Sequence, residues 1–368
     1  MKIVLIGGRS IPNQGGIEQY MVNLAAQLHA HGHQVVLMCR GKESKETFCS
    51  GVKVVQHWCP ECVLSILIHN IRASLYLLLS REPCDIVNYQ SIFFPVFYEW
   101  LPRLIGAKVI HTQHSFAQDN PKHGKLSKVL IGGVYFFSRM VCSPILTVSQ
   151  HNQNLVRKRL GRDSTIVRCG VNVQEHVVKS DIVEKYGLEE DEYYLSIGRI
   201  DPVKNLDVLI QAFLSRRVSS AKKLVICGDD RNEYGRYLHE LAGDDARVVF
   251  AGPVYGDYKE ALLEYAFAFC LVSTSEGFPI ALLEAMAHGC PCICSDIPAN
   301  EEALSRELGI WCTARDVNDL RKQMESLEKN KGNLKVIGMK LRDRVKMHFS
   351  WDKVAATYLG VIKKLIKY

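Results

Sequence analysis

Two basic side chains stand close together in the second half of the sequence, where their types and spacing suit the binding of an anion. Arg199 and Lys204 lie between an apolar stretch that predicts a strand (193–197) and a stretch with helical periodicity (206–214). An arginine offers a planar fork of donors and a lysine offers a point charge, so both side chains can converge on a diphosphate. The alternative is a pair of solvated charges in a surface loop.

Two glutamates farther along the chain are candidates for binding hydroxyl groups. Glu276 follows a predicted strand (267–272) and Glu284 lies in a predicted helix (280–288), which places the two carboxylates about 10 Å apart. That span suits two hydroxyl-bearing groups separated by a diphosphate, because carboxylates accept hydrogen bonds from hydroxyls and the amides of a first helical turn point toward a phosphate. In the alternative interpretation Glu276 caps the helix and Glu284 is a buried structural acid.

The first half of the chain carries a glycine pair and a histidine in comparable positions. Gly15 and Gly16 lie between a predicted strand (2–7) and a helix, where glycines let backbone amides approach an anion or simply make a tight connection. Their spacing differs from G-x-G-x-x-G and no acidic residue ends the second predicted strand, which argues against a nicotinamide dinucleotide site. His114 follows the predicted strand 107–112, although a lone histidine is more often structural.

Two successive series of βα units must position these residues. Short apolar, β-branched runs alternate with helix-period stretches, which is typical of parallel sheets covered by helices. A polar, acidic stretch (170–191) separates the two series and predicts a linker. We therefore expect an α/β protein with two facing, doubly wound, Rossmann-like domains, and ligands at the carboxyl ends of the strands in the cleft between them. The expected strands are 2–7, 34–39, 52–56, 85–89, 107–112, 145–148 and 165–168, then 193–197, 223–227, 247–250, 267–272, 291–294 and 308–312.

The net charge is distributed unevenly along the 368 residues. The whole chain carries +7, but residues 1–180 hold 20 basic and 10 acidic side chains, which leaves a net charge of −3 for residues 181–368. No recognised nucleic-acid motif accompanies the basic residues, so we expect no nucleic-acid partner. The thirteen cysteines lie in apolar runs rather than at framework spacings, and this usage excludes a disulfide-stapled scaffold.

Basic and apolar residues interleave in the first half, which favours contact with an anionic membrane surface. The basic members are Arg72, Arg81, Lys122, Lys125, Lys128 and Arg139, and the apolar members are Leu75–Leu79, Leu126, Val129, Leu130, Ile131, Tyr135 and Phe136. No apolar stretch has the roughly 20 uninterrupted residues of a spanning helix, so a peripheral or soluble protein is expected. The alternative is a solvated basic face over core helices.

Taken in order, these motifs resemble those of one enzyme family. The motifs are Gly15-Gly16 before the first helix, Gly198-Arg199 with Lys204, and Glu276-x7-Glu284 followed by Ala-Met-Ala. Together they resemble the retaining glycosyltransferases of family 4, which have the GT-B fold. The variant Ile11-Pro12-x-x-Gly15-Gly16-x-Glu18 is most similar to bacterial members that build cell-surface polysaccharides. The similarity covers essentially the whole chain.

The resemblance implies a role for each candidate residue. Arg199 and Lys204 would bind the donor diphosphate, Glu284 the ribose hydroxyls, and Glu276 the 3- and 4-hydroxyls of the donor sugar. Gly15 and Gly16 would close on the phosphates from the acceptor side, and His114 would contact the transferring sugar. Backbone amides would lie near the donor at Gly277, Phe278, Pro279 and Ile280. The resemblance implies no bound metal and no cofactor.

The resemblance also implies where the domains begin and end. An acceptor-side domain would span 1–172, a nucleotide-sugar-binding domain 190–348, and a C-terminal helix over about 350–368 would cross back to the first domain. Two positions depart from the usual motifs. Cys169-Gly170-Val171-Asn172 stands for the family's Asn-Gly-Val-Asp, and His114-Ser115 stands for its His-Asp pair, so acidic contacts are not expected at either place.

These implications define the expected function. The protein would transfer a sugar with retention from a nucleotide-sugar to a polyprenyl-diphosphate-linked saccharide in bacterial O-antigen, capsule or exopolysaccharide synthesis. A UDP-sugar is favoured as donor, and GDP-mannose and dTDP-rhamnose are compatible. The expected location is cytoplasmic, on the inner face of the cytoplasmic membrane. The alternatives are a sugar-nucleotide epimerase on the same fold and a non-catalytic protein that binds a sugar-nucleotide or a glycan.

Overall fold

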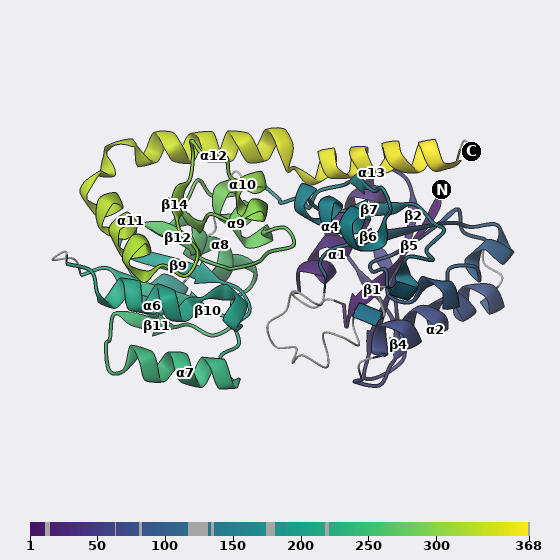
Figure 1. Ribbon diagram of the computed structural model, residues 1–368, viewed down its shortest axis with the longest axis horizontal. Coiled ribbons are helices and arrows are strands. Elements are labelled where there is room, and N and C mark those ends of the chain that lie inside the picture. The colour runs from purple at the N-terminus through teal and green to yellow at the C-terminus, as the bar shows by residue number, and fades with distance from the viewer. Residues whose placement is uncertain are drawn as a thin grey trace. The chain divides into compact units, whose positions relative to one another are not determined.

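The chain folds into two α/β units. The computed structural model describes residues 1–11, 15–62, 64–80, 83–116, 132–133, 136–173, 181–217 and 221–366. Unit 1 consists of Met1–Gly170 and Trp351–Tyr368, and unit 2 consists of Val171–Ser350 (Figure 1). The predicted pair of doubly wound α/β domains is therefore confirmed. The cleft expected between them stays a prediction.

Unit 1 is built on an eight-stranded sheet in the order β3-β4-β2-β1-β5-β6-β7-β8, with helices on both sides. Every neighbouring pair is parallel except β3 and β4. The strands are β1 (Lys2–Arg9), β2 (Gln34–Gly41), β3 (Lys45–Cys49), β4 (Val52–Trp58), β5 (Ile86–Tyr89), β6 (Lys108–Gln113), β7 (Ile145–Thr147) and β8 (Thr165–Ile166). The helices include α1 (Gly16–Ala30), α2 (Ser65–Ser80), α4 (Gln150–Leu160) and α13 (Trp351–Ile366), with short 3-10 turns η1 (Pro95–Phe97) and η2 (Pro102–Ile105).

The edge strand β3 has no counterpart among the predicted strands. It pairs antiparallel with β4 through a two-residue turn, Ser50-Gly51, in which both residues have positive φ. Two such residues form the turn that suits a tight hairpin. The strand is largely exposed and reads Lys-Glu-Thr-Phe-Cys, so it lacks the apolar run that marks the buried strands. The Ser50-Gly51 pair is the sequence feature from which this hairpin turn could have been predicted.

The C-terminal helix α13 belongs to unit 1. Its Tyr358 is buried, and the hydroxyl accepts a 3.0 Å hydrogen bond from Nδ2 of Asn88, which lies on β5. At the start of the helix, the ring of Trp351 meets that of Tyr20 on α1 edge-on, with centroids 5.8 Å apart. Residues at the two ends of the chain therefore share one core.

Unit 2 is built on a six-stranded, wholly parallel sheet in the order β11-β10-β9-β12-β13-β14. The strands are β9 (Tyr193–Ile197), β10 (Lys223–Cys227), β11 (Val248–Phe250), β12 (Ala268–Leu271), β13 (Cys292–Ser295) and β14 (Ile310–Cys312). The helices include α5 (Ile182–Lys185), α6 (Leu206–Leu214), α7 (Glu233–Ala242), α8 (Gly256–Glu264), α9 (Ile280–Ala287), α10 (Pro298–Ala303), α11 (Val317–Lys329) and α12 (Leu334–His348), with the turns η4 (Pro202–Lys204) and η5 (Lys331–Asn333).

The strand order reverses once in each sheet, and this determines where a ligand can bind. From β1 the sheet continues outward to β2, β4 and the hairpin strand β3, and from β5 it continues in the other direction to β6, β7 and β8. In unit 2 the sheet likewise continues outward from β9 to β10 and β11, and from β12 to β13 and β14. The connections on either side of such a point leave the carboxyl edge in opposite directions, which opens a crevice there. Ligand-binding residues are therefore expected near the carboxyl ends of β1 and β5 in unit 1, and near those of β9 and β12 in unit 2.

Candidate functional site

The basic pair of unit 2 lies at the switch point of its sheet, which is the place between β9 and β12 where the strand order reverses. Arg199 comes two residues after the end of β9, and Lys204 ends the turn η4. Asp201 caps this turn with its side chain, and Asn205 after it adopts a left-handed conformation (φ 49°). Nδ2 of Asn205 donates a 2.9 Å hydrogen bond to the carbonyl of Val272 beyond β12, so the loop after β9 is tied to the neighbouring strand.

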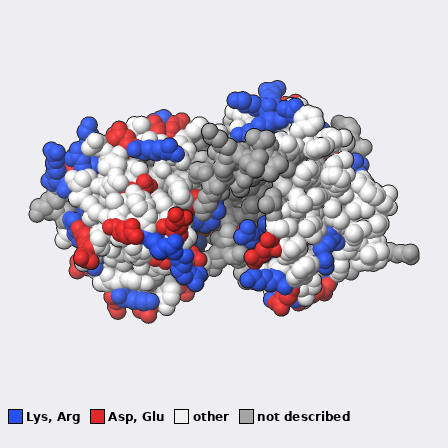
Figure 2. Space-filling model, turned by 60° about the horizontal axis from the view of Figure 1, so that its bottom comes forward, with Lys and Arg blue, Asp and Glu red and all other residues white. Residues whose placement is uncertain are grey.

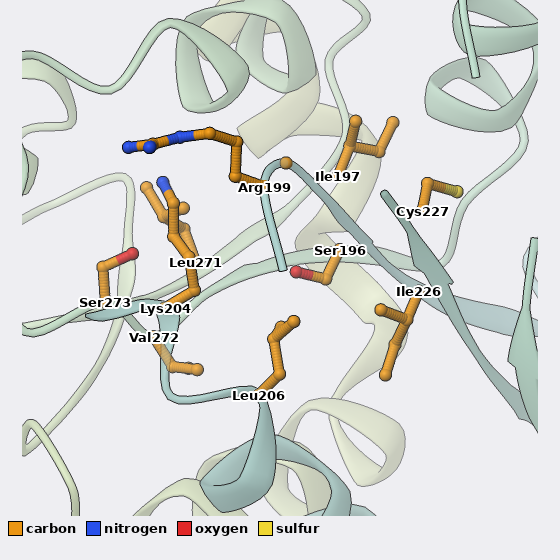
Figure 3. A pocket seen from close by; sticks show the side chains of 11 residues that line it. Ser196, Ile197, Arg199, Lys204, Leu206, Ile226, Cys227, Leu271, Val272 and Ser273 are labelled. Atoms are coloured by element: carbon orange, nitrogen blue, oxygen red, sulfur yellow. The ribbon is translucent and has the colours of Figure 1, made fainter. Parts of the chain in front are cut away.

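Arg199 and Lys204 line one pocket. Figure 3 shows their charged ends extending to the same side of it, while its wall comes from the ends of β9, β10 and β12. The other lining residues are Ser196, Ile197, Gly198, Leu206, Ile226, Cys227, Leu271, Val272 and Ser273. Arg199 is exposed and makes no hydrogen bond or ion pair with another described residue, so its guanidinium is available to an anion.

Glu276 is paired with Lys204. Oε1 of Glu276 lies 2.6 Å from Nζ of Lys204, and the two side chains are only 12% and 18% exposed. The hydroxyl of Ser273 donates to the same carboxylate oxygen at 2.6 Å, and the amide of Thr274 donates to the carbonyl of Val203 at 2.8 Å. Two residues predicted for different parts of a ligand therefore meet directly. Ser273 was not among the predicted site residues.

Glu284 is held by a residue that the sequence analysis did not single out. Its Oε1 lies 2.8 Å from Nζ of Lys259 on α8, and both side chains are 20% exposed. Glu284 is the only acidic residue of α9, whose sequence is Ile-Ala-Leu-Leu-Glu-Ala-Met-Ala. An ion pair offsets the cost of placing a carboxylate in this apolar helix.

His288 extends this charged cluster behind the site. It follows the end of α9, and its Nε2 and Nδ1 lie 2.6 Å from Oε2 of Glu260 and 3.0 Å from Oε2 of Glu264, both on α8. Burial opposes the charged imidazolium, but these two carboxylates outweigh it and raise the pKa of His288 to about 9. Arg342 on α12 then pairs with Glu264 at 3.1 Å and donates to the carbonyl of His288 at 2.7 Å.

The turn between Glu276 and α9 was predicted to offer backbone amides. Pro279 has no amide hydrogen, and the amide of Ile280 donates to the carbonyl of Phe278 at 3.1 Å. Phe278 is buried, and its ring lies 5.7 Å from that of Phe349. Two of the four predicted positions, Pro279 and Ile280, therefore cannot offer a backbone amide to a ligand in this conformation.

The glycine pair of unit 1 is shaped by Glu18. Glu18 is buried on α1, and its Oε1 accepts a 2.6 Å hydrogen bond from the amide of Arg9 at the end of β1. A Cβ on Gly15 would collide with the other oxygen of this carboxylate, so a larger residue there would require the buried Glu18 side chain to shift. Gly16 then begins α1. Glu18 thus fixes the loop after β1, a role that the motif alone did not reveal.

His114 lies beyond β6 and contacts the two elements at the switch point of unit 1. Its Nε2 lies 2.9 Å from Oε1 of Gln90, which follows β5, and its ring meets that of Tyr20 on α1 edge-on at 4.9 Å. Its carbonyl accepts a 2.7 Å bond from Nδ2 of Asn152. Burial of the ring lowers the pKa of His114 to about 3, so the imidazole is neutral at physiological pH. Gln90 was not predicted.

Only some of the basic and apolar residues predicted to face a membrane belong to the part of the chain that the structure describes. Arg81, Lys122, Lys125, Lys128, Leu126, Val129, Leu130, Ile131 and Tyr135 lie outside the described residues. Arg72 lies with its guanidinium 5.8 Å from the ring centroid of Trp58, and Arg139 lies 5.9 Å from that of Phe136. Among the described helices, none is both long and apolar enough to cross a bilayer.

The geometry defines what unit 2 can bind. A free guanidinium, a lysine and the start of α9 suit a diphosphate, and Glu276 and Glu284 on either side of that turn suit hydroxyl groups. Across the ranges that the structure describes, no three His, Cys, Asp or Glu side chains come close enough together to hold a metal ion. This set of groups suits a ligand with two hydroxyl-bearing ends joined by phosphates.

Comparisons with known proteins show which protein family this chain resembles. The model for "Glycosyltransferase Family 4" matches residues 14–175, and the model for "Glycosyl transferases group 1" matches residues 178–346. The chain is 26% identical to an uncharacterized glycosyltransferase of Methanocaldococcus jannaschii, over 99% of this chain and 98% of that protein. It is 25% identical to the UDP-Gal:alpha-D-GlcNAc-diphosphoundecaprenol alpha-1,3-galactosyltransferase of Escherichia coli, over 78% and 79% of the two chains.

A solved structure gives the same result for the fold. The sucrose-phosphate synthase of Thermosynechococcus elongatus matches with a TM-score of 0.81 at 19% sequence identity, over 100% of this chain and 99% of that one. The two parallel-sheet units thus make up the GT-B fold, as the sequence motifs predicted.

Proposed function

The chain belongs to the glycosyltransferases, and from this premise we propose that it transfers a sugar, with retention of configuration, from a nucleotide-sugar to a lipid-linked saccharide. The observation that carries the proposal is the Lys204–Glu276 pair beside Arg199 at the switch point of the second sheet. A bound diphosphate would attract the ammonium group of Lys204 away from Glu276. The hydroxyls of the donor sugar would then donate hydrogen bonds to the Glu276 carboxylate.

The main requirement for catalysis of this reaction is stabilisation of the leaving diphosphate. The bond between the anomeric carbon and the diphosphate oxygen breaks, and a bond from the same carbon to the acceptor oxygen forms. Negative charge develops on the diphosphate, where Arg199, Lys204 and the start of α9 would stabilise it. In this proposal these groups supply the positive charge, and no metal ion is required.

Retention follows if the acceptor attacks from the face that the diphosphate leaves. The departing phosphate oxygen then accepts the proton of the acceptor hydroxyl, so the step needs no separate base. His114, neutral at physiological pH, would act as a hydrogen-bond partner of the transferring sugar rather than as a charge. Gly15 and Gly16 would offer backbone amides to the phosphates. The configuration of the product's new glycosidic bond, read by NMR, tests this step, because an inverted bond would refute front-face attack.

We favour a UDP-sugar as the donor. One relative, from Escherichia coli, is named for UDP-Gal, and a carboxylate at Glu284 suits a ribose with both hydroxyls better than the deoxyribose of dTDP. A thermal-shift screen of UDP, GDP and dTDP tests this choice. A ligand at 100 times its dissociation constant stabilises the protein by about 2.7 kcal/mol. The shift should vanish in Lys204→Met and persist in Arg321→Met, a control ion-pair variant on α11.

The aromatic surface of unit 1 supports a lipid-linked acceptor. We use this name for Phe93, Phe94, Phe97, Phe136 and Phe137, in which the centroids of contacting rings lie 5.2 to 6.1 Å apart. Phe97, Phe136 and Phe137 are 53%, 64% and 47% exposed. Figure 2 shows that unit 1, on the right, presents a broad area without charged side chains, while basic and acidic side chains mix on unit 2. Exposed aromatic rings of this kind suit a membrane interface.

A buried network fixes this surface. Glu99 accepts hydrogen bonds from Nε2 of His111 at 3.2 Å, the hydroxyl of Ser143 at 2.8 Å and the amide of Cys142 at 3.0 Å. Burial opposes the charge of Glu99, but these bonds outweigh it and lower its pKa to about 2. The network joins the segment of Phe93–Phe97 to that of Phe136–Phe137, and Phe94 is held in a left-handed conformation (φ 53°). The segments that carry these rings are therefore connected through buried hydrogen bonds.

We therefore propose that unit 1 lies on the inner face of the cytoplasmic membrane, where it meets a polyprenyl-diphosphate-linked saccharide of a bacterial surface polysaccharide. Flotation with liposomes of neutral or anionic lipid tests the contact. Anionic liposomes should carry the protein, and the double variant Phe136→Ser/Phe137→Ser should float at least several-fold less. Phe48→Ser, on the exposed edge strand β3, is the control. No flotation with anionic liposomes, or no effect of the double variant, would refute the membrane contact, and equal flotation with both lipids would refute the preference for an anionic surface.

A further inference from the structure

The charged cluster behind Glu284 links three helices of unit 2. Ion pairs run from Glu284 to Lys259, on to Glu260 and His288, and then through Glu264 to Arg342, with acidic and basic groups alternating. The Lys259–Glu260 distance of 3.9 Å is the weakest link, whereas Lys259–Glu284 at 2.8 Å is a direct hydrogen bond. Lys259 is thus the residue that connects the cluster to the candidate site.

Lys259 engages one side of the Glu284 carboxylate only. Oε1 accepts the lysine hydrogen bond, while Oε2 has no hydrogen-bond partner among the described residues. A carboxylate carries about four acceptor positions over its two oxygens, so Oε2 remains able to accept from a ligand hydroxyl. Since both side chains of the pair are four-fifths buried, water screens their electrostatic attraction less than that of a surface pair. Lys259 therefore stabilises the negative charge of the Glu284 carboxylate and fixes its orientation.

We infer that Lys259 is a positioning residue that makes the site selective for a ribonucleotide. By holding Oε1 of Glu284, it presents Oε2 to a ribose hydroxyl, and a 2′-deoxyribose would leave this buried acceptor incompletely satisfied. The inference rests on the proposed nucleotide-sugar donor and on Glu284 as the carboxylate that faces its ribose. Lys259 itself does not touch the reacting atoms.

The size of the effect follows from the hydrogen bond concerned. A hydrogen bond to a charged group contributes enough for a discrimination of roughly tenfold to a hundredfold. Without Lys259 the carboxylate can rotate and hydrate, so most of this discrimination is lost. An arginine at position 259 can still donate to Oε1 and should retain it.

Titration calorimetry with UDP and 2′-deoxy-UDP, and with GDP and 2′-deoxy-GDP, tests the inference. The wild type should bind one ribonucleoside diphosphate at least tenfold more tightly than its deoxy counterpart. In Lys259→Met and in Glu284→Gln this ratio should fall below about threefold, with little change in the affinity for the deoxy compound. Lys259→Arg should keep the ratio.

Arg321→Met is the matched control. It removes an ion pair of similar burial, Arg321–Glu325 at 3.3 Å with side chains 14% and 15% exposed, on α11 of the same unit. Its ratio should equal that of the wild type. If Lys259→Met lowers its thermal midpoint, the ratio measured well below that midpoint still decides the question, because general destabilisation weakens both ligands alike.

Three outcomes overturn the inference. An unchanged ratio in Lys259→Met, or equal weakening of both ligands, refutes the role of Lys259 while the proposed function stands. A wild type that binds the deoxy compound as tightly as the ribonucleotide also refutes it. A wild type that binds none of these compounds, and that shows no thermal shift with dTDP either, refutes the proposed function itself.

Discussion

His288 gives unit 2 a stability that depends on pH in a direction opposite to that expected of an ordinary buried histidine. Its imidazolium is 6% exposed and sits between Glu260 and Glu264 at 2.6 and 3.0 Å. These carboxylates raise its pKa from 6.5 to about 9 in the folded state. The folded protein therefore holds this proton more tightly than the unfolded chain does.

The sign and size of the effect follow from that difference. Stability from a raised pKa is fully present below 6.5 and is lost as the pH rises through 9. A pKa change from 6.5 to about 9 corresponds to about 3 kcal/mol, at roughly 1.4 kcal/mol for each pH unit between the two values. The free energy of unfolding should therefore fall by about 3 kcal/mol between pH 6 and pH 9 on account of this residue.

Urea unfolding of the wild type and of His288→Gln at several pH values measures this contribution. The difference in unfolding free energy between the two proteins should shrink by about 3 kcal/mol from pH 6 to pH 9, while contributions from unit 1 cancel. Arg321→Met, which removes an ion pair without a histidine on α11, should run parallel to the wild type. Parallel curves for His288→Gln and the wild type would refute the assignment of a charged imidazole at this position.

Two further predictions concern unit 1. Gly15→Ala should break the bond between Glu18 and the amide of Arg9 and lower the unfolding free energy by about 1 to 2 kcal/mol, measured by urea titration, with a matching loss of transfer activity. Gly360→Ala, whose added Cβ meets no atom within 4 Å on α13, should be neutral or stabilising, and a similar loss there would contradict the argument. His114, whose pKa is lowered to about 3, contributes stability that is present above pH 6.5 and is lost as the pH falls, by about 1.4 kcal/mol per pH unit. His114→Asn should therefore lose less stability than the wild type between pH 6.5 and pH 5, and equal slopes would show that the folded protein takes up this proton as readily as the unfolded chain does.

The sequence was informative wherever a local pattern decides the structure. Apolar runs marked β9 and β12, and the loops after them contained Arg199, Lys204 and Glu276. Parallel strands share one carboxyl edge, so these loops had to lie at the same end of the sheet. The edge strand β3 was missed because its residues are charged and exposed, and no period of apolar residues marks it.

Contacts between distant residues could not be predicted in the same way. Lys204 and Glu276 are 72 residues apart, and Lys259 and Glu284 are 25 apart on different helices. Their pairing depends on strand order and on helix packing, which a single sequence does not specify. Glu99 likewise reads as an ordinary surface acid in the sequence, and only the fold shows that it is buried among His111, Cys142 and Ser143.

The most direct test of the central claim is the release of nucleoside diphosphate from a nucleotide-sugar, measured with and without a polyprenyl-diphosphate-linked saccharide. We predict release only when donor and acceptor are both present, at a rate at least tenfold lower in Lys204→Met and unchanged in Arg321→Met. Conversion of the donor to another sugar without acceptor would identify an epimerase. Donor binding without release on any such acceptor would identify a binding protein, and either result would contradict the proposed glycosyl transfer.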